Sequence, residues 1–295
     1  DLIFYQADIH GNQLVTERMK ALRKIIEGKP QTVITTFAAL MSPQVPLEEI
    51  AASVIHIDAD SSLNEGELAR KLAEMGYEKN YQVDAPGQFS IRGGIIDIFD
   101  LTEENPYRIE LWGEEVESIR SFDLLSQRSV EKLNEVDIYP ATEMMLSEEQ
   151  KEKGLRRIEK EAKEFEEKLR SSFLTEEAHR VKTQIKELRE QVMEFSLMTN
   201  LESYIRYFYD DTVSFLRFFP EGESCVFIDE AARVKEQALA VEMEFRESMG
   251  HRLEKGYILP GQADLLYGWE ETAGFLQHMR TVLFSSMDSS NALLK

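Results

Sequence analysis

The chain has 295 residues, and its 34 Lys and Arg against 55 Asp and Glu give a net charge of −21. Such an acidic surface repels phosphates, so we expect no strong DNA binding by this chain. The single cysteine, Cys225, excludes an internal disulfide, and no apolar run reaches the roughly eighteen residues that span a bilayer. We therefore expect a cytoplasmic protein without a membrane segment, and the opening residue Asp1 indicates part of a longer protein.

The first section, to about residue 80, alternates strand patterns with helix patterns, as parallel α/β units do. The runs QTVITTF (Gln31–Phe37) and SVIHID (Ser53–Asp58) are rich in β-branched residues and are predicted to be buried strands. Asn64 and Glu67 have the spacing of a capping box, so a helix should begin there and end at Gly76. An earlier helix is predicted from apolar residues at helical spacing, namely Val15, Met19, Leu22 and Ile26.

The first of two strand patterns in the middle of the chain is FSIRGGIIDIF. Phe89 and Ile91 fall on one face of this strand, and Arg92 falls on the other, because strand side chains alternate. Gly93 and Gly94 interrupt the pattern, as glycines do at a bulge or a close backbone approach. The run that follows, IIDIF, is apolar enough to be buried on both faces.

The second strand pattern is PYRIELW, which ends at Trp112. Its aliphatic residues occupy one face, so Arg108, Glu110 and Trp112 share the opposite face. Tryptophan and arginine are the residues most enriched at binding hot spots, so this face is a candidate binding surface. The alternative is structural: the indole could be half covered by its own domain, with the arginine stacked on it or paired with Glu110.

Two helices are predicted between Ser147 and Val192, separated by a break at Ser171–Thr175. Each carries an apolar seam at helical spacing, and both packing within the chain and a coiled coil with a partner fit these seams. Further on, SCVFID (Ser224–Asp229) and TVLFSS (Thr281–Ser286) are strand patterns with a helix between them. Cys225 is expected to be buried in the first of these strands.

Asp229 and Glu230 end an apolar strand in the manner of a Walker B motif, which holds magnesium in nucleotide-driven motors. The sequence contains no G-x-x-x-x-G-K-[ST] phosphate loop, so we expect a vestigial motif, no nucleotide cofactor and no enzyme activity. His56 has no other metal ligand near it in sequence, and no metal site is predicted. A nucleotide-dependent helicase fragment and a direct DNA-binding module remain the alternatives.

Four stretches resemble one family in order and spacing: FSIRGGIIDIF, NPYRIELWGEEVESIRSFD, SQRS and IYPA. They are similar to bacterial transcription-repair coupling factors (Mfd), in the region that this family shares with the excinuclease component UvrB. The likeness extends over AHRVKTQIKELREQVMEFSLMTNLESYIRYF and SCVFIDEAARV, and it is weakest over the last forty or so residues.

The resemblance implies a non-catalytic recruitment module of transcription-coupled nucleotide excision repair. It implies an incomplete, helicase-like (RecA-like) parallel α/β domain with a helical hairpin, formed by residues 1–80 and 142–295. A small strand-rich α+β domain, residues 81–141, would be inserted there and dock the excinuclease component UvrA. The full-length family protein also engages RNA polymerase and DNA, as an ATP-dependent translocase. The docking positions of the family match Arg92, Arg108 and Trp112, while Arg120 and Arg128 are weaker candidates that could equally hold the domain together.

Overall fold

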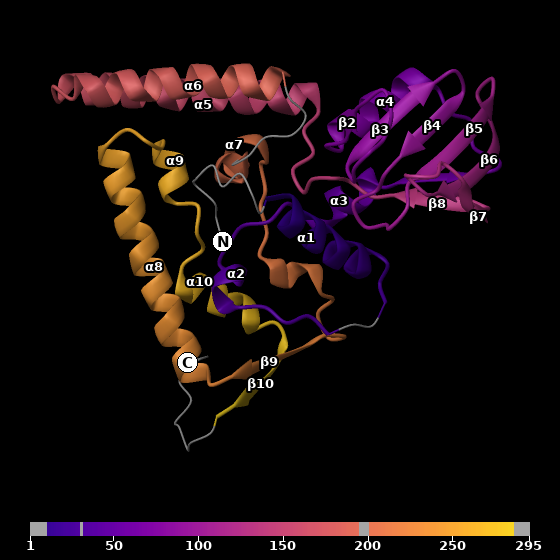
Figure 1. Cartoon of the computed structure of the whole chain (residues 1–295). Coiled ribbons are helices and arrows are strands. Elements are labelled where there is room, and N and C mark those ends of the chain that lie inside the picture. The colour runs from indigo at the N-terminus through magenta and orange to yellow at the C-terminus, as the bar shows by residue number, and fades with distance from the viewer. Residues whose placement is uncertain (1–10, 30–31, 195–200, 286–295) are drawn as a thin grey trace.

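The computed structural model describes residues 11–29, 32–194 and 201–285, and it is a mixed helix and strand structure with several sheets (Figure 1). Three separate clusters of buried apolar side chains form its cores. We name the three parts after what surrounds each core: the sheet unit, the helical unit and the C-terminal unit. The sheet unit carries the candidate binding residues, and the other two units flank it in sequence.

The sheet unit, residues 55–141, is built on a six-stranded sheet with the order β2-β3-β4-β5-β6-β7. Neighbouring strands are antiparallel except β2 and β3, which are parallel. Helix α4 (Glu65–Glu74) contributes Leu68 and Leu72 to the core beneath the sheet. The strands are β2 (Glu78–Lys79), β3 (Gln88–Arg92), β4 (Ile95–Ile98), β5 (Tyr107–Trp112), β6 (Glu115–Phe122) and β7 (Ser129–Leu133).

Strand β1 (Ile55–Asp58) belongs to the core of the sheet unit. The predicted strand is confirmed. The expectation that it pairs parallel with a neighbouring strand is wrong, because β1 pairs antiparallel with β8 (Glu135–Ile138). Ile57 shares a core with the six-stranded sheet, so residues before position 81 pack inside this unit. Asn64 caps α4 as predicted, accepting hydrogen bonds from the backbone N–H groups of Gly66 and Glu67. The division of the chain at residues 80 and 141 stays a prediction.

The helical unit consists of α1 (Gly11–Ile26), α5 (Glu148–Ser171), α6 (Thr175–Glu194) and α7 (Ile205–Phe208). Helices α5 and α6 lie side by side as a hairpin (Figure 1), which confirms the two helices predicted from the sequence. Both apolar seams are buried in the same core, so these helices pack within the chain. None of the described helices is both long and apolar enough to cross a membrane.

The C-terminal unit holds a parallel pair of strands, β9 (Cys225–Asp229) and β10 (Arg280–Phe284). One face of this pair packs on α8 (Ala231–Glu254) and α10 (Trp269–Leu276) through residues such as Ile228, while Phe227 and Phe284 on the other face are exposed. The short elements of the chain are α2 (Phe37–Leu40), α3 (Leu47–Ser53), α9 (Pro260–Ala263) and the 3-10 turns Leu201–Tyr204 and Phe215–Phe218.

Two expectations about these flanks are wrong. Residues 32–36 of the run Gln31–Phe37 form no strand, Ile34 is 94% exposed, and Thr36 instead caps α2. The physical reason is that β-branched residues form a strand only where another strand offers its backbone, and none of the described strands pairs with these residues. Cys225 is exposed rather than buried, because it lies on the uncovered face of β9.

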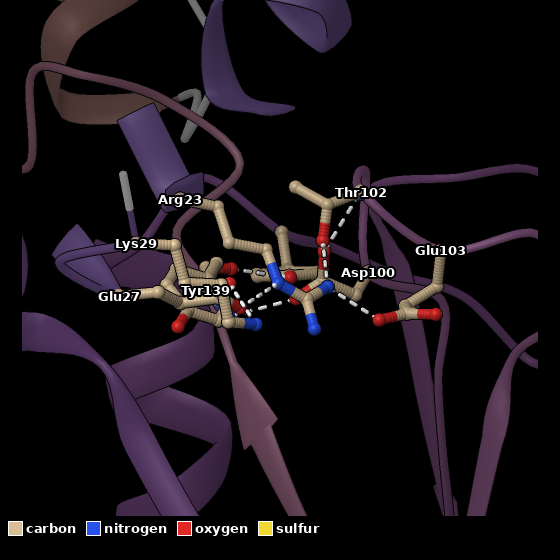
Figure 2. A network of polar contacts seen from close by, with 8 residues as sticks. Arg23, Glu27, Lys29, Asp100, Thr102, Glu103 and Tyr139 are labelled. Atoms are coloured by element: carbon tan, nitrogen blue, oxygen red, sulfur yellow. Dashed lines mark hydrogen bonds and ion pairs between the residues drawn. The ribbon is translucent and has the colours of Figure 1, made fainter. Parts of the chain in front are cut away.

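A polar network joins α1 to the sheet unit (Figure 2). Arg23 donates hydrogen bonds to Thr102 Oγ1 at 2.6 Å and to Glu103, and its guanidinium lies over the ring of Tyr139. The buried carboxylate of Asp100 accepts hydrogen bonds from the Thr102 backbone N–H and hydroxyl and from the Tyr139 backbone N–H, each at 2.7 Å. Burial raises the pKa of Asp100 above its ordinary value. The network fixes the sheet unit against the helical unit.

The contact of α5 with α7 yields a test of the helical unit. A Cβ atom at Gly154 would lie 2.2 Å from the ring of Phe208, whereas one at Gly250 in α8 meets nothing within 4 Å. We expect Gly154→Ala to lower the free energy of unfolding by about 1–3 kcal/mol, because the ring must be displaced. Gly250→Ala is the matched control and should raise it by about 0.5–1 kcal/mol. Urea unfolding measures both, and a stabilised Gly154→Ala contradicts this packing.

Candidate partner-binding face

The six-stranded sheet has one apolar face and one polar face. On β5, Tyr107, Ile109 and Leu111 are buried in the core, and the alternate residues lie on the opposite face. This arrangement confirms the alternation predicted for the run PYRIELW. Trp112 is 78% exposed at the end of the strand, so the indole is not covered by its own domain. We call the polar side of the sheet, together with Trp112, the arginine face.

Asp97 on β4 is the buried centre of the arginine face. Its side chain is only 1% exposed, and in the sheet register it stands opposite Arg108. Arg108 donates through Nε to Oδ1 at 2.6 Å and through Nη2 to Oδ2 at 2.8 Å. Arg92 on β3 donates through Nη2 to Oδ2 at 3.0 Å. One carboxylate therefore holds both arginines that the family resemblance implicates in docking.

The guanidinium of Arg108 makes several contacts within the chain. Besides the two bonds to Asp97, Nη2 donates to the amide oxygen of Gln127 at 2.9 Å, and the guanidinium lies 4.2 Å from the ring centre of Phe122. The side chain is only 14% exposed. The hydrogen bonds to Asp97 raise the pKa of Arg108 above its ordinary value. Arg108 is thus fixed in position, and most of its hydrogen-bonding capacity is used within the chain.

Arg92 is more available than Arg108. It makes one hydrogen bond to Asp97, and its side chain is 34% exposed. The ring of Tyr81 lies against its guanidinium at 5.6 Å, and Tyr81 itself is 84% exposed. A partner can therefore reach the remaining N–H groups of Arg92.

The two weaker candidates differ from each other. Arg120 on β6 forms an internal ion pair, donating to Glu110 at 2.6 Å, and its part in docking stays a prediction. The hydrogen bonds from Arg120 and Ser118 lower the pKa of Glu110 below its ordinary value. Arg128 is exposed, and in the described part of the chain its side chain makes no ion pair. The sheet thus brings Arg92, Arg108 and Arg120 onto one face, and Arg128 lies on the loop beside it.

Sequence reasoning missed several residues of this region. Of these residues, only Asp97 could have been identified from the sequence. It is a carboxylate inside the apolar run IIDIF, and a buried charge needs a partner. Tyr81 and Gln127 lie outside the strand patterns, and only the folded loops bring them to Arg92 and Arg108. No local pattern could have identified them.

The Walker B-like pair lies at the end of β9. Asp229 is exposed, and Glu230 has a left-handed backbone with φ of 53° at the start of α8. The backbone N–H of Glu230 donates to the carbonyl of Phe284 on β10. Across residues 11–29, 32–194 and 201–285 no group of His, Cys, Asp and Glu is arranged to hold a metal ion. The vestigial role of the pair stays a prediction.

Comparison with known proteins agrees with the resemblance read from the sequence. The family model of the UvrB interaction domain matches residues 55–144, which contain the whole arginine face. A transcription-repair-coupling factor of Bacillus subtilis (strain 168) is 34% identical over 259 residues, 88% of this chain and 22% of that protein. The Staphylococcus aureus (strain Mu50 / ATCC 700699) protein of the same name is 28% identical over 279 residues, 92% of this chain and 23% of that protein. The chain spans less than a quarter of the length of these relatives, and over most of its own length it is similar to transcription-repair coupling factors.

Proposed function

We propose that the sheet unit docks UvrA, the damage-recognition component of the excinuclease, and so brings nucleotide excision repair to a stalled RNA polymerase in the cytoplasm. The description of the matched domain supports a docking role, and the name of the relatives supports the coupling of transcription to repair. The observation that carries the proposal is the indole of Trp112, 78% exposed on a rigid sheet whose same face bears Arg92 and Arg108.

Each residue of the face has a distinct part in this docking. Trp112 fills an apolar pocket of the partner, because a large rigid aromatic gains area at little entropic cost. Arg92 offers its outward N–H groups to a partner carboxylate, which is the geometry that guanidinium groups favour. Arg108 stands behind it, held by Asp97, and completes the charge at the surface. Arg120 is used inside the unit by Glu110.

In this proposal the chain recruits without hydrolysing nucleotide, and its flanks form an incomplete RecA-like domain into which the sheet unit is inserted. The parallel strands β9 and β10, which are connected in the chain through the long helix α8, support a RecA-like origin. The absence of a phosphate loop from the sequence supports the lack of hydrolysis. In this proposal, contacts with RNA polymerase and DNA are made by the parts of the full-length protein that this chain does not span.

A nucleotide titration tests the non-catalytic part of the proposal. Because nothing in the sequence cradles the β- and γ-phosphates, calorimetry of the chain with MgATP is expected to show no saturable heat. Saturable binding that is lost in Asp229→Asn would instead identify a nucleotide-dependent helicase fragment.

Binding to purified UvrA tests the docking face. Trp112→Ala and Arg108→Ala are each expected to weaken binding by about 2 kcal/mol or more, roughly thirtyfold, which is the loss typical of an interface hot spot. Phe173→Ala is the matched control, because Phe173 is 92% exposed at the turn between α5 and α6, outside the sheet unit. Parent-like affinity of Trp112→Ala, with Phe173→Ala equally unchanged, would remove the basis of this assignment.

A charge substitution tests the role of Asp97. Asp97→Asn leaves two guanidinium groups without their shared buried carboxylate, so the free energy of unfolding should fall by about 3–5 kcal/mol. Glu110→Gln is the control, because its pair with Arg120 is a third exposed and should cost less than about 1 kcal/mol. Denaturant unfolding followed by circular dichroism measures both changes. An equal fall in the free energy of unfolding for both substitutions would contradict the idea that the buried ion pairs of Asp97 matter more for stability than the exposed pair of Glu110.

A further inference from the structure

The loop between β6 and β7 carries a leucine whose exposed side chain is not part of the core of the sheet unit. Leu125 is 95% exposed, although leucine is among the residues that gain most from burial. A single exposed apolar residue on a mobile segment is ordinary, so the question is whether this loop is held in place. We name residues 123–128 the anchor loop.

The anchor loop is fixed by hydrogen bonds across its own base. The backbone N–H of Gln127 donates to the carbonyl of Asp123 at 2.8 Å, and that of Asp123 donates to the carbonyl of Arg128 at 2.9 Å. The carboxylate of Asp123 accepts a further bond from the backbone N–H of Ser126 at 2.8 Å. Leu125 is therefore presented on a closed turn rather than on a free strand end.

Gln127 ties the anchor loop to the arginine face. Its backbone has a φ of 58°, in the left-handed region that disfavours residues other than glycine. Its side-chain amide donates to the carbonyl of Leu124 at 2.8 Å and accepts from Arg108 Nη2 at 2.9 Å. Asp97 thus binds Arg108, Arg108 binds Gln127, and Gln127 binds the turn that carries Leu125. Such local strain is found where a surface must be held in one shape.

We infer that the anchor loop is a second contact element of the docking face, with Leu125 entering an apolar pocket of UvrA. This inference rests on the proposed function. In this docking Arg128, which is exposed on the same loop, pairs with a carboxylate of the partner at the rim of that pocket. Gln127 is a positioning residue: it touches Arg108 and the loop backbone and holds Leu125 at a fixed place relative to the sheet.

A titration of UvrA with the full chain tests Leu125. Leu125→Ala is expected to weaken binding about tenfold, because an apolar anchor is lost while the fold is untouched. Ile34→Ala is the matched control: Ile34 is an aliphatic residue with 94% exposure, outside the sheet unit, and its loss should leave affinity unchanged. Leu125→Ala that binds like Ile34→Ala overturns the inference, whereas a parent chain that fails to bind UvrA overturns the proposed function itself.

A second variant tests the positioning role of Gln127. Gln127→Gly accepts the left-handed φ without strain and removes the amide that joins Leu124 to Arg108. We expect about threefold or greater loss of UvrA affinity and faster protease cleavage after Leu124 or Leu125, with no fall in the unfolding midpoint. Parent-like affinity and parent-like protection of the loop would show that Gln127 does not position Leu125.

Discussion

The sharing of one buried carboxylate by two arginines is the interaction on which the arginine face depends. Asp97 is 1% exposed, and an isolated charge at such a depth would be strongly destabilising. The two-point contact with Arg108 and the further bond from Arg92 compensate this charge with good geometry. Because the trio carries one net positive charge, the face stays cationic at its centre in a chain that is otherwise strongly acidic.

The shared carboxylate also decides which groups can meet a partner. Arg108 is turned inward and held between Asp97, Gln127 and Phe122, whereas Arg92 keeps part of its guanidinium at the surface beside Tyr81. Three large side chains of the sheet unit are also strongly exposed: Trp112 by 78%, Tyr81 by 84% and Leu125 by 95%. A surface of this kind places rigid apolar anchors around a few fixed charges, which is how protein interfaces concentrate their binding energy.

A second buried carboxylate sets the orientation of this surface. Asp100 follows the same strand as Asp97, but its partners are Thr102 and the backbone of Tyr139, which Arg23 of α1 contacts in turn (Figure 2). The short segment IIDIFD thus contains Asp97, which holds the two arginines of the arginine face, and Asp100, which lies at the junction with the helical unit. A docking unit fixed in this way can present its face in one direction relative to the rest of the protein.

The sequence by itself determined the features that depend on neighbours along the chain. The cap of α4 at Asn64 follows from the type and spacing of residues at a helix start. The seams of α5 and α6 and the face of β5 that carries Trp112 follow from periodicities of 3.6 and two residues. Only the tertiary structure decided the rest. Residues 32–36 pair with no strand among the described residues, β1 belongs to the sheet unit, and Cys225 lies on an uncovered face. The grouping of Arg92, Asp97, Arg108 and Gln127 depends on strand register and loop closure, which bring distant residues together and leave no local pattern in the sequence.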